Sequence, residues 1–142
     1  QVLQARGGER ARVGHGGDGL DELTTTGPSS VVELRDGSIT TWEVDPEELG
    51  LRRADREDLV GGDAAVNADL ARRVLAGEAG AHRDIVVLNA GAGLVVAGLA
   101  EGIADGMTAA AGAIDSGAAV AALARMVEIS QEELAREAGQ RQ

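Results

Sequence analysis

Residues 31–44 read Val-Val-Glu-Leu-Arg-Asp-Gly-Ser-Ile-Thr-Thr-Trp-Glu-Val, and this stretch predicts a β-hairpin. The runs 31–34 and 38–44 are rich in β-branched residues, which favour strands. Asp36-Gly37 lies between the two runs, and this dipeptide favours the tight turn in which both central residues have positive φ. Residues 31–44 therefore predict two adjacent antiparallel strands, and the other elements are predicted outward from them.

The residues that follow the hairpin predict a run of helices. Asp63 can cap a helix that ends near Gly77. Residues 84–98 are ambiguous, because residues 85–88 read as a buried strand whereas the later alanines and glycines suit a closely packed helix. Apolar residues spaced three and four apart over 103–114 predict an amphipathic helix. The sequence therefore predicts short strands and a β-hairpin followed by a run of helices.

Three finer expectations concern where elements begin. Residues 46–50 predict a single helical turn. Ser116 can cap a further helix with Val120, Leu123 and Val127 on its inner face. Residues 130–133 match the capping box Ser-x-x-Glu, which predicts a separate short polar helix at the end of the chain.

A glycine-rich stretch upstream of the hairpin is the best candidate for a functional site. A short strand is predicted at residues 11–13, and residues 14–22 then read Gly-His-Gly-Gly-Asp-Gly-Leu-Asp-Glu. Glycines let the backbone approach a ligand closely, and from a loop Asp21 and Glu22 can converge on one metal ion. Mg²⁺ prefers one or two carboxylates together with waters and phosphate oxygens. The stretch therefore predicts a magnesium and phosphate-ester site, and the alternative is a solvated acidic turn.

Other candidate residues carry weaker signals. The pattern Gly-x-Gly-x-x-Gly at 14–19 matches the dinucleotide fingerprint formally, but Gly27-Pro28 comes too soon for the helix that the fingerprint requires. His15 has no identifiable partner for a general-base role. His82 is expected at the surface. Asn89, in an apolar run, is expected to be a buried amide with its hydrogen bonds satisfied, and a binding role for it stays open.

Composition narrows the function classes. The 142 residues carry a formal net charge of -11 and contain no Cys, so neither a disulfide framework nor a thiolate metal site is possible. An acidic surface repels polyanions, so we expect no nucleic-acid partner. The longest apolar run, residues 85–100, contains Asn89 and is shorter than the roughly 20 residues of a membrane helix. We therefore expect a cytoplasmic protein with no membrane association.

The order of motifs along the chain resembles the anthranilate phosphoribosyltransferase family. The resemblance covers nearly all of residues 1–128, and several ordered motifs are more specific than any one of them. The stretch from Val13 to Thr26 carries the family's Asp-Glu step at Asp21 and Glu22. The further matches are 46–50, 61–67, 75–77, 83–91 and 113–118.

The resemblance implies a reaction and a cofactor. In this family the amine of anthranilate attacks C1 of phosphoribosyl pyrophosphate, pyrophosphate leaves, and the product enters tryptophan biosynthesis. Asp21 and Glu22 sit on the family's magnesium-binding step, so Mg²⁺ is the expected cofactor. The ambiguous residues 84–98 are helical in the family, and we adopt that expectation.

The resemblance also implies that residues 1–142 form only the C-terminal portion of the α/β domain. The family's N-terminal helical dimerisation domain, its Gly-rich pyrophosphate loop and its Lys-His-Gly-Asn segment have no counterpart in these residues, which contain no Lys. We expect the chain to be inactive alone and the full-length protein to be a homodimer through that N-terminal domain. The alternatives are a protein like pyrimidine nucleoside phosphorylase, a phosphoribosyltransferase with another acceptor, and a non-catalytic half that needs a partner chain.

Overall fold

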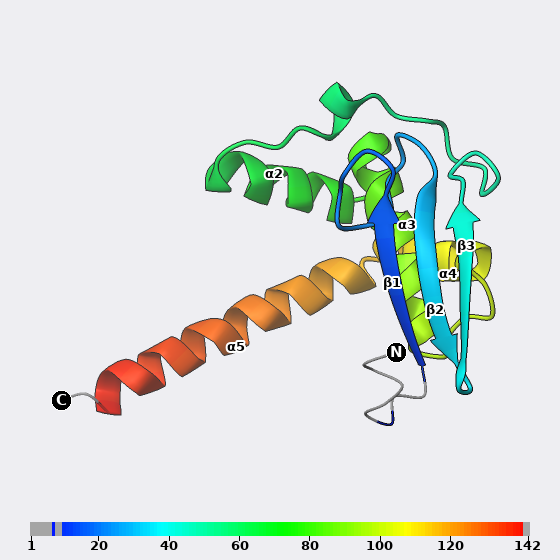
Figure 1. The fold of residues 1–142 in the computed structure, drawn as a ribbon. Helices are drawn as coiled ribbons and strands as arrows, with labels where there is room; N and C mark the ends of the chain where they lie inside the picture. Colours follow the sequence, from blue (N-terminus) through cyan, green and yellow to red (C-terminus); the bar gives the residue numbers. More distant parts are fainter. Residues whose placement is uncertain (1–6, 8–9, 141–142) are drawn as a thin grey trace.

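The computed structural model describes residue 7 and residues 10–140. Three strands, β1 (Arg10–Gly16), β2 (Ser29–Arg35) and β3 (Ser38–Val44), form an antiparallel sheet in the order β1-β2-β3. Four helices follow a short 3-10 helix, η1 (Arg56–Leu59): α2 (Ala64–Leu75), α3 (Ala81–Val96), α4 (Ile103–Asp115) and α5 (Ala118–Gln140). The expected fold class, short strands and a hairpin followed by helices, is confirmed (Figure 1).

The hairpin forms for the reason that its sequence suggests. Asp36 and Gly37 connect β2 and β3 with φ of 50° and 77°, so both central residues of the turn are left-handed. Strand pairing then places Val31 opposite Trp42, and Gly14 of β1 opposite Val31. Because side chains alternate along a strand, these three residues share one face of the sheet.

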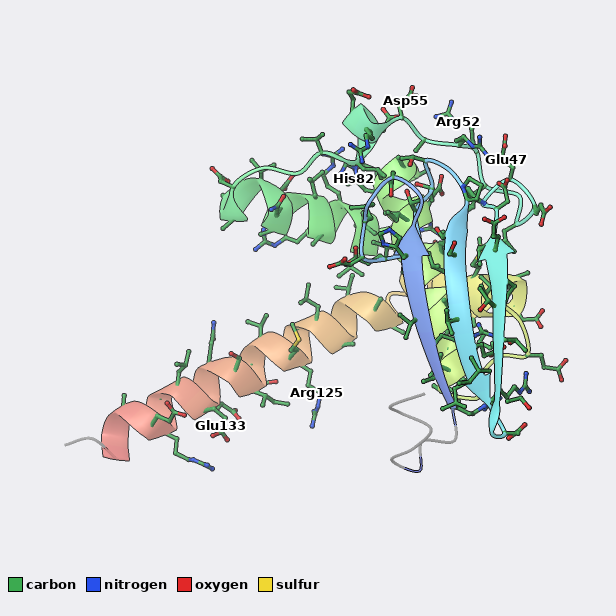
Figure 2. All side chains as sticks on the ribbon, in the orientation of Figure 1. Glu47, Arg52, Asp55, His82, Arg125 and Glu133 are labelled. Carbon is green, nitrogen blue, oxygen red and sulfur yellow. The ribbon has the colours of Figure 1, made fainter. Side chains whose placement is uncertain are left out.

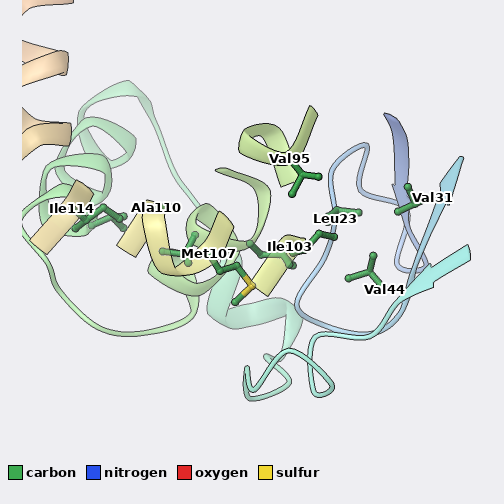
Figure 3. Packing of buried hydrophobic residues seen from close by; sticks show 11 residues of the cluster. Leu23, Val31, Val44, Val95, Ile103, Met107, Ala110 and Ile114 are labelled. Atoms are coloured by element: carbon green, nitrogen blue, oxygen red, sulfur yellow. The ribbon is translucent and has the colours of Figure 1, made fainter. Parts of the chain in front are cut away.

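The helices α3 and α4 cover that face of the sheet and build the core with it (Figure 1). Val31 and Val44 of the sheet pack in one cluster with Leu88 and Val95 of α3 and with Ile103 of α4. Figure 3 shows the buried side chains of α4 continuing this cluster in a row away from the strands. All four α4 residues that the sequence pattern marks as apolar are buried: Ile103, Met107, Ala110 and Ile114.

Two helices of the core meet at a glycine contact. Gly91 of α3 and Gly106 of α4 are both buried, and a Cβ at Gly91 would lie 2.6 Å from the backbone nitrogen of Met107. A Cβ at Gly106 would overlap the carbonyl group of Gly91. The small-residue composition of residues 84–98 therefore serves close helix packing, and the helical expectation for that segment is confirmed.

Two local expectations between the sheet and α2 have different outcomes. Residues 46–50 form successive hydrogen-bonded turns, not a regular helix, with Leu49 N bonded to Pro46 O at 3.2 Å. Asp63 does cap α2, since its carboxylate accepts hydrogen bonds from the amides of Ala65 and Val66 at 3.0 Å.

The C-terminal helix corrects three further expectations. α5 is one continuous helix through Ser130, so no separate terminal helix begins there. Ser116 ends α4 and donates to Ala113 O at 3.4 Å, and Gly117, with φ of 79°, separates it from α5. Beyond its first turns α5 extends away from the sheet (Figure 1). Of its expected inner face, Val120 and Val127 are each 44% exposed, and Leu123 is half-buried.

No single helix in the described part of the chain is long and apolar enough to cross a membrane. The helices α4 and α5 meet that test only as a pair, with a bend of 71° between them.

Candidate metal-binding site

The two carboxylates predicted as metal ligands lie on the loop that connects β1 and β2, residues 17–28, which we call the connecting loop. Asp21 and Glu22, here called the acidic pair, are both exposed. Within the described residues neither carboxylate forms an ion pair or a hydrogen bond. The acidic pair is therefore two uncompensated negative charges presented by a loop.

The backbone on the N-terminal side of the acidic pair is fixed by the loop itself. Leu20 N donates to Asp18 Oδ1 at 3.1 Å, and Leu20 O accepts from Gly16 N at 2.9 Å. Both polar groups of Leu20 are therefore bonded. Hydrogen bonds within the loop therefore hold this end of the acidic pair in place.

The backbone on the C-terminal side is fixed from a helix. Leu23 N donates to Asn89 Oδ1 at 3.0 Å, and Asn89 Nδ2 donates to Leu23 O at 2.8 Å. The side chain of Leu23 lies in the core. The expectation that Asn89 is an amide with satisfied hydrogen bonds is confirmed, although the residue is half-buried.

Asp18 organises the interior of the connecting loop. Its Oδ2 accepts hydrogen bonds from the hydroxyls of Thr24 and Thr26, each at 2.7 Å. Burial raises the pKa of the Asp18 carboxyl, but these two hydrogen bonds and that from the Leu20 amide together outweigh it, so the pKa is lowered. The ionised Asp18 carboxylate therefore connects Leu20, Thr24 and Thr26 of the loop through hydrogen bonds.

The first glycines of the loop are required by this internal packing. A Cβ at Gly16 would lie 2.6 Å from Asp18 Oδ1, and a Cβ at Gly17 would lie 2.8 Å from Pro28 O. Gly19 has φ of 96°, which a side chain would strain. Packing and backbone conformation therefore favour glycine at these three positions whether or not a ligand binds.

A depression of about 200 Å³ opens beside the acidic pair between the sheet and α3. Its lining combines Asp21, Glu22 and Asn89 with apolar side chains of the core. Arg12 lines it as well, but its guanidinium pairs with Glu33 at 2.8 Å and lies 5.4 Å from the centroid of the Trp42 ring. The only charges of this depression that lack a partner in the described residues are therefore negative.

The two histidines take different places. His15 is exposed, and strand alternation points it to the face of β1 opposite Gly14, which lines the depression. His82 lies in the first turn of α3 (Figure 2), and it lines a second depression, of about 340 Å³, together with Glu22. The residue is half-buried, so the expected surface position is confirmed in part, although its Nε2 is buried without a hydrogen-bond partner in the described residues.

Comparison with known families defines the class of protein. Residues 1–120 match the model of the glycosyl transferase family, a/b domain. The chain therefore belongs to this family, as its fold and motif order predict.

Curated relatives narrow the resemblance to one activity. The anthranilate phosphoribosyltransferase of Parvibaculum lavamentivorans is 56% identical over 127 residues, which are 89% of this chain and 37% of the relative. That of Methylorubrum populi is 54% identical over 130 residues, 92% of this chain and 39% of the relative. The chain thus spans less than half the length of these relatives.

Solved structures agree in fold. The anthranilate phosphoribosyltransferase from Thermus thermophilus is 42% identical with a TM-score of 0.77, over 87% of this chain and 36% of that one. A variant of the Saccharomyces cerevisiae enzyme with Mg bound gives a TM-score of 0.79 at 20% identity, over 89% and 37% of the two chains. The second likeness is evidence for the fold only.

Proposed function

We propose that this chain forms the metal-binding edge of the active site of an anthranilate phosphoribosyltransferase. The observation that carries the proposal is the acidic pair. These two exposed carboxylates lie between Leu20 and Leu23, and the backbone N–H and C=O groups of both leucines are hydrogen-bonded. Relatives 54 to 56% identical carry that enzyme's name, and the motif containing Asp21 and Glu22 lies within the shared region.

The donor set fits Mg²⁺. The described residues contain no group of three or more His, Cys, Asp or Glu side chains able to hold a metal ion. A site of two carboxylates suits Mg²⁺, which keeps several waters and takes further ligands from substrate phosphates. Asp21 and Glu22 would hold the ion directly or through water, leaving its other positions for phosphate oxygens.

The charge of the chain explains why a metal is needed. At a net charge of -11 the protein repels phosphoribosyl pyrophosphate, and the acidic pair adds to that repulsion locally. When bound, Mg²⁺ would neutralise the pyrophosphate and stabilise the charge on it as it leaves. The chain's own part would be to hold the two carboxylates in place for that ion.

The remaining properties of the whole enzyme belong to the same proposal. The Saccharomyces cerevisiae enzyme is known in complex with phosphoribosyl pyrophosphate and Mg. We extend those ligands and anthranilate to the complete protein, with residues 1–142 as a portion of its α/β domain. A cytoplasmic location and a homodimer built through the family's N-terminal domain are part of this proposal.

Metal binding by the acidic pair can be tested on the chain itself. Mn²⁺ at low molar ratio broadens amide signals near its binding site, so NMR spectra locate the ion. We expect broadening centred on residues 20–23, and Asp21→Asn or Glu22→Gln should weaken binding by on the order of 100-fold, since carboxylate charge sets affinity for such ions. Glu43→Gln, on exposed β3, is the control and should bind as the unaltered chain does. Broadening that is equal in all variants would exclude the acidic pair.

The reaction itself can be tested with a chimera. This chain replaces the matching 36% of the Thermus thermophilus protein, and anthranilate consumption is followed with phosphoribosyl pyrophosphate and Mg²⁺. We expect transfer, its loss with Glu22→Gln and its retention with Glu43→Gln. A folded chimera that instead cleaves a pyrimidine nucleoside with phosphate, or that transfers to another acceptor, would contradict the proposal.

A further inference from the structure

We propose that Asn89 is the positioning residue of the acidic pair, fixing from α3 the direction in which Asp21 and Glu22 present their carboxylates. The inference rests on the proposed metal site. It assigns to Asn89 a role in metal affinity, beyond that of a polar side chain whose hydrogen bonds are satisfied.

The hydrogen bonds of Asn89 have a pattern that permits one orientation only. Its Oδ1 accepts from Leu23 N at 3.0 Å, and its Nδ2 donates to Leu23 O at 2.8 Å and to Ile85 O at 3.0 Å. Turning the amide over would oppose donor to donor and acceptor to acceptor. The side chain therefore holds both polar backbone groups of Leu23, the residue directly after Glu22.

The third hydrogen bond ties this contact to a rigid element. Ile85 lies one turn before Asn89 in α3, so the amide is held against its own helix. Leu88, the residue directly before Asn89, is fully buried in the core. Asn89 thus links α3 to the connecting loop, at Leu23, which lies 66 residues away in the sequence.

Asn89 also lies at the edge of the site. Glu22 and Asn89 are the two residues that line both depressions beside the connecting loop. Its amide therefore lies next to the space beside the acidic pair while its hydrogen bonds hold the backbone directly after Glu22. Loss of a partner that orients metal ligands typically weakens metal binding by about 10- to 100-fold.

The test compares Mn²⁺ binding by Asn89→Ala and Asn89→Leu with that of the unaltered chain, by amide broadening. Asn89→Leu keeps the branching at Cγ, in a somewhat larger side chain, and removes the hydrogen bonds. Ile114→Ala, buried at the far end of α4 (Figure 3), is the control that removes core packing away from the loop. We expect both Asn89 variants to bind Mn²⁺ at least about tenfold more weakly and to exchange the Leu23 amide proton faster. Ile114→Ala should change neither at a temperature where it is folded.

Each outcome decides between the two ideas. Asn89 variants that fold and bind Mn²⁺ as the unaltered chain does would overturn the positioning role while leaving the metal site intact. Asn89 variants that fail to fold while Ile114→Ala folds would make Asn89 a structural residue only. An unaltered chain that shows no broadening near residues 20–23 would overturn the proposed function, and the positioning role with it.

Discussion

Asp18 is the residue on which the order of the connecting loop depends. It accepts from two threonine hydroxyls and from the Leu20 amide, and Arg56 donates to its carbonyl oxygen. Thr24, one of those threonines, is fully buried, and its Oγ1 lies 3.1 Å from that of Thr26, so without the carboxylate one of the two hydroxyls can donate to the other while the second loses its protein acceptor. Asp21 and Glu22 follow Asp18 by three and four residues, and the Leu20 amide that Asp18 holds directly precedes them.

The first prediction concerns Asp18→Ala, which should lower the free energy of unfolding by about 1 kcal/mol or more at pH 7, because one threonine hydroxyl loses its acceptor and the Leu20 amide loses its partner. Because the folded pKa is below the ordinary value of about 3.9, this stabilisation is complete above that value and is lost as the pH falls through the folded pKa. Urea unfolding at pH 7 and near pH 3 should show the difference between the two chains shrinking in acid. Glu43→Gln is the control. A difference that grows in acid would contradict this account.

Sequence reasoning reached the acidic pair but not the residues that hold it. Asp21 and Glu22 are adjacent, so their shared location is visible in the sequence. Asn89 is 66 residues from the loop that it holds, and no local pattern connects it to Leu23. Its position in an apolar run predicted a satisfied amide, whereas the identity of its partners required the packing of α3 against the loop.

At the scale of elements, local signals were reliable where a special backbone conformation was needed. Asp36-Gly37 predicted its turn because few residues adopt positive φ. The capping box at residues 130–133 failed because no Gly or Pro interrupts residues 118–138, so the helix continues through it. For α3, periodicity could not separate strand from helix, and the resemblance supplied the right answer.

The second prediction concerns the contact between α3 and α4. Gly106→Ala should destabilise the protein by about 1–3 kcal/mol, because the added methyl group overlaps the backbone of Gly91 in a core that has no room to yield. Gly112→Ala, in the same helix but with no neighbouring atom within 4 Å of its Cβ, should instead stabilise by about 0.5–1 kcal/mol. Thermal unfolding of the two variants tests this directly. Equal shifts in the same direction would mean that helix propensity, not the crossing, governs both sites.

For the molecule as a whole, charge and length set its behaviour. The chain spans about two fifths of its relatives or less, and its sheet has an open face on which Val13 is 60% exposed. It carries 24 acidic and 13 basic residues, which give a net charge of -11. Like charges repel in the compact state, and this repulsion is long-ranged at low ionic strength, where the Debye length reaches about 30 Å.

The last prediction separates this general repulsion from the metal site. Raising NaCl from about 10 mM to about 150 mM shortens the Debye length to about 8 Å, so the Tm of the unaltered chain and of Glu22→Gln should rise by the same amount. Mg²⁺ at matched ionic strength should stabilise the unaltered chain further, by about 1.4 kcal/mol at ten times its Kd. Glu22→Gln should gain much less, because its remaining carboxylate binds the ion weakly. Calorimetry in NaCl and in Mg²⁺ measures the stabilisation from charge screening and the stabilisation from metal binding. If Mg²⁺ stabilises both chains equally, it acts on the diffuse charge of the whole molecule, and the acidic pair has no special affinity for it.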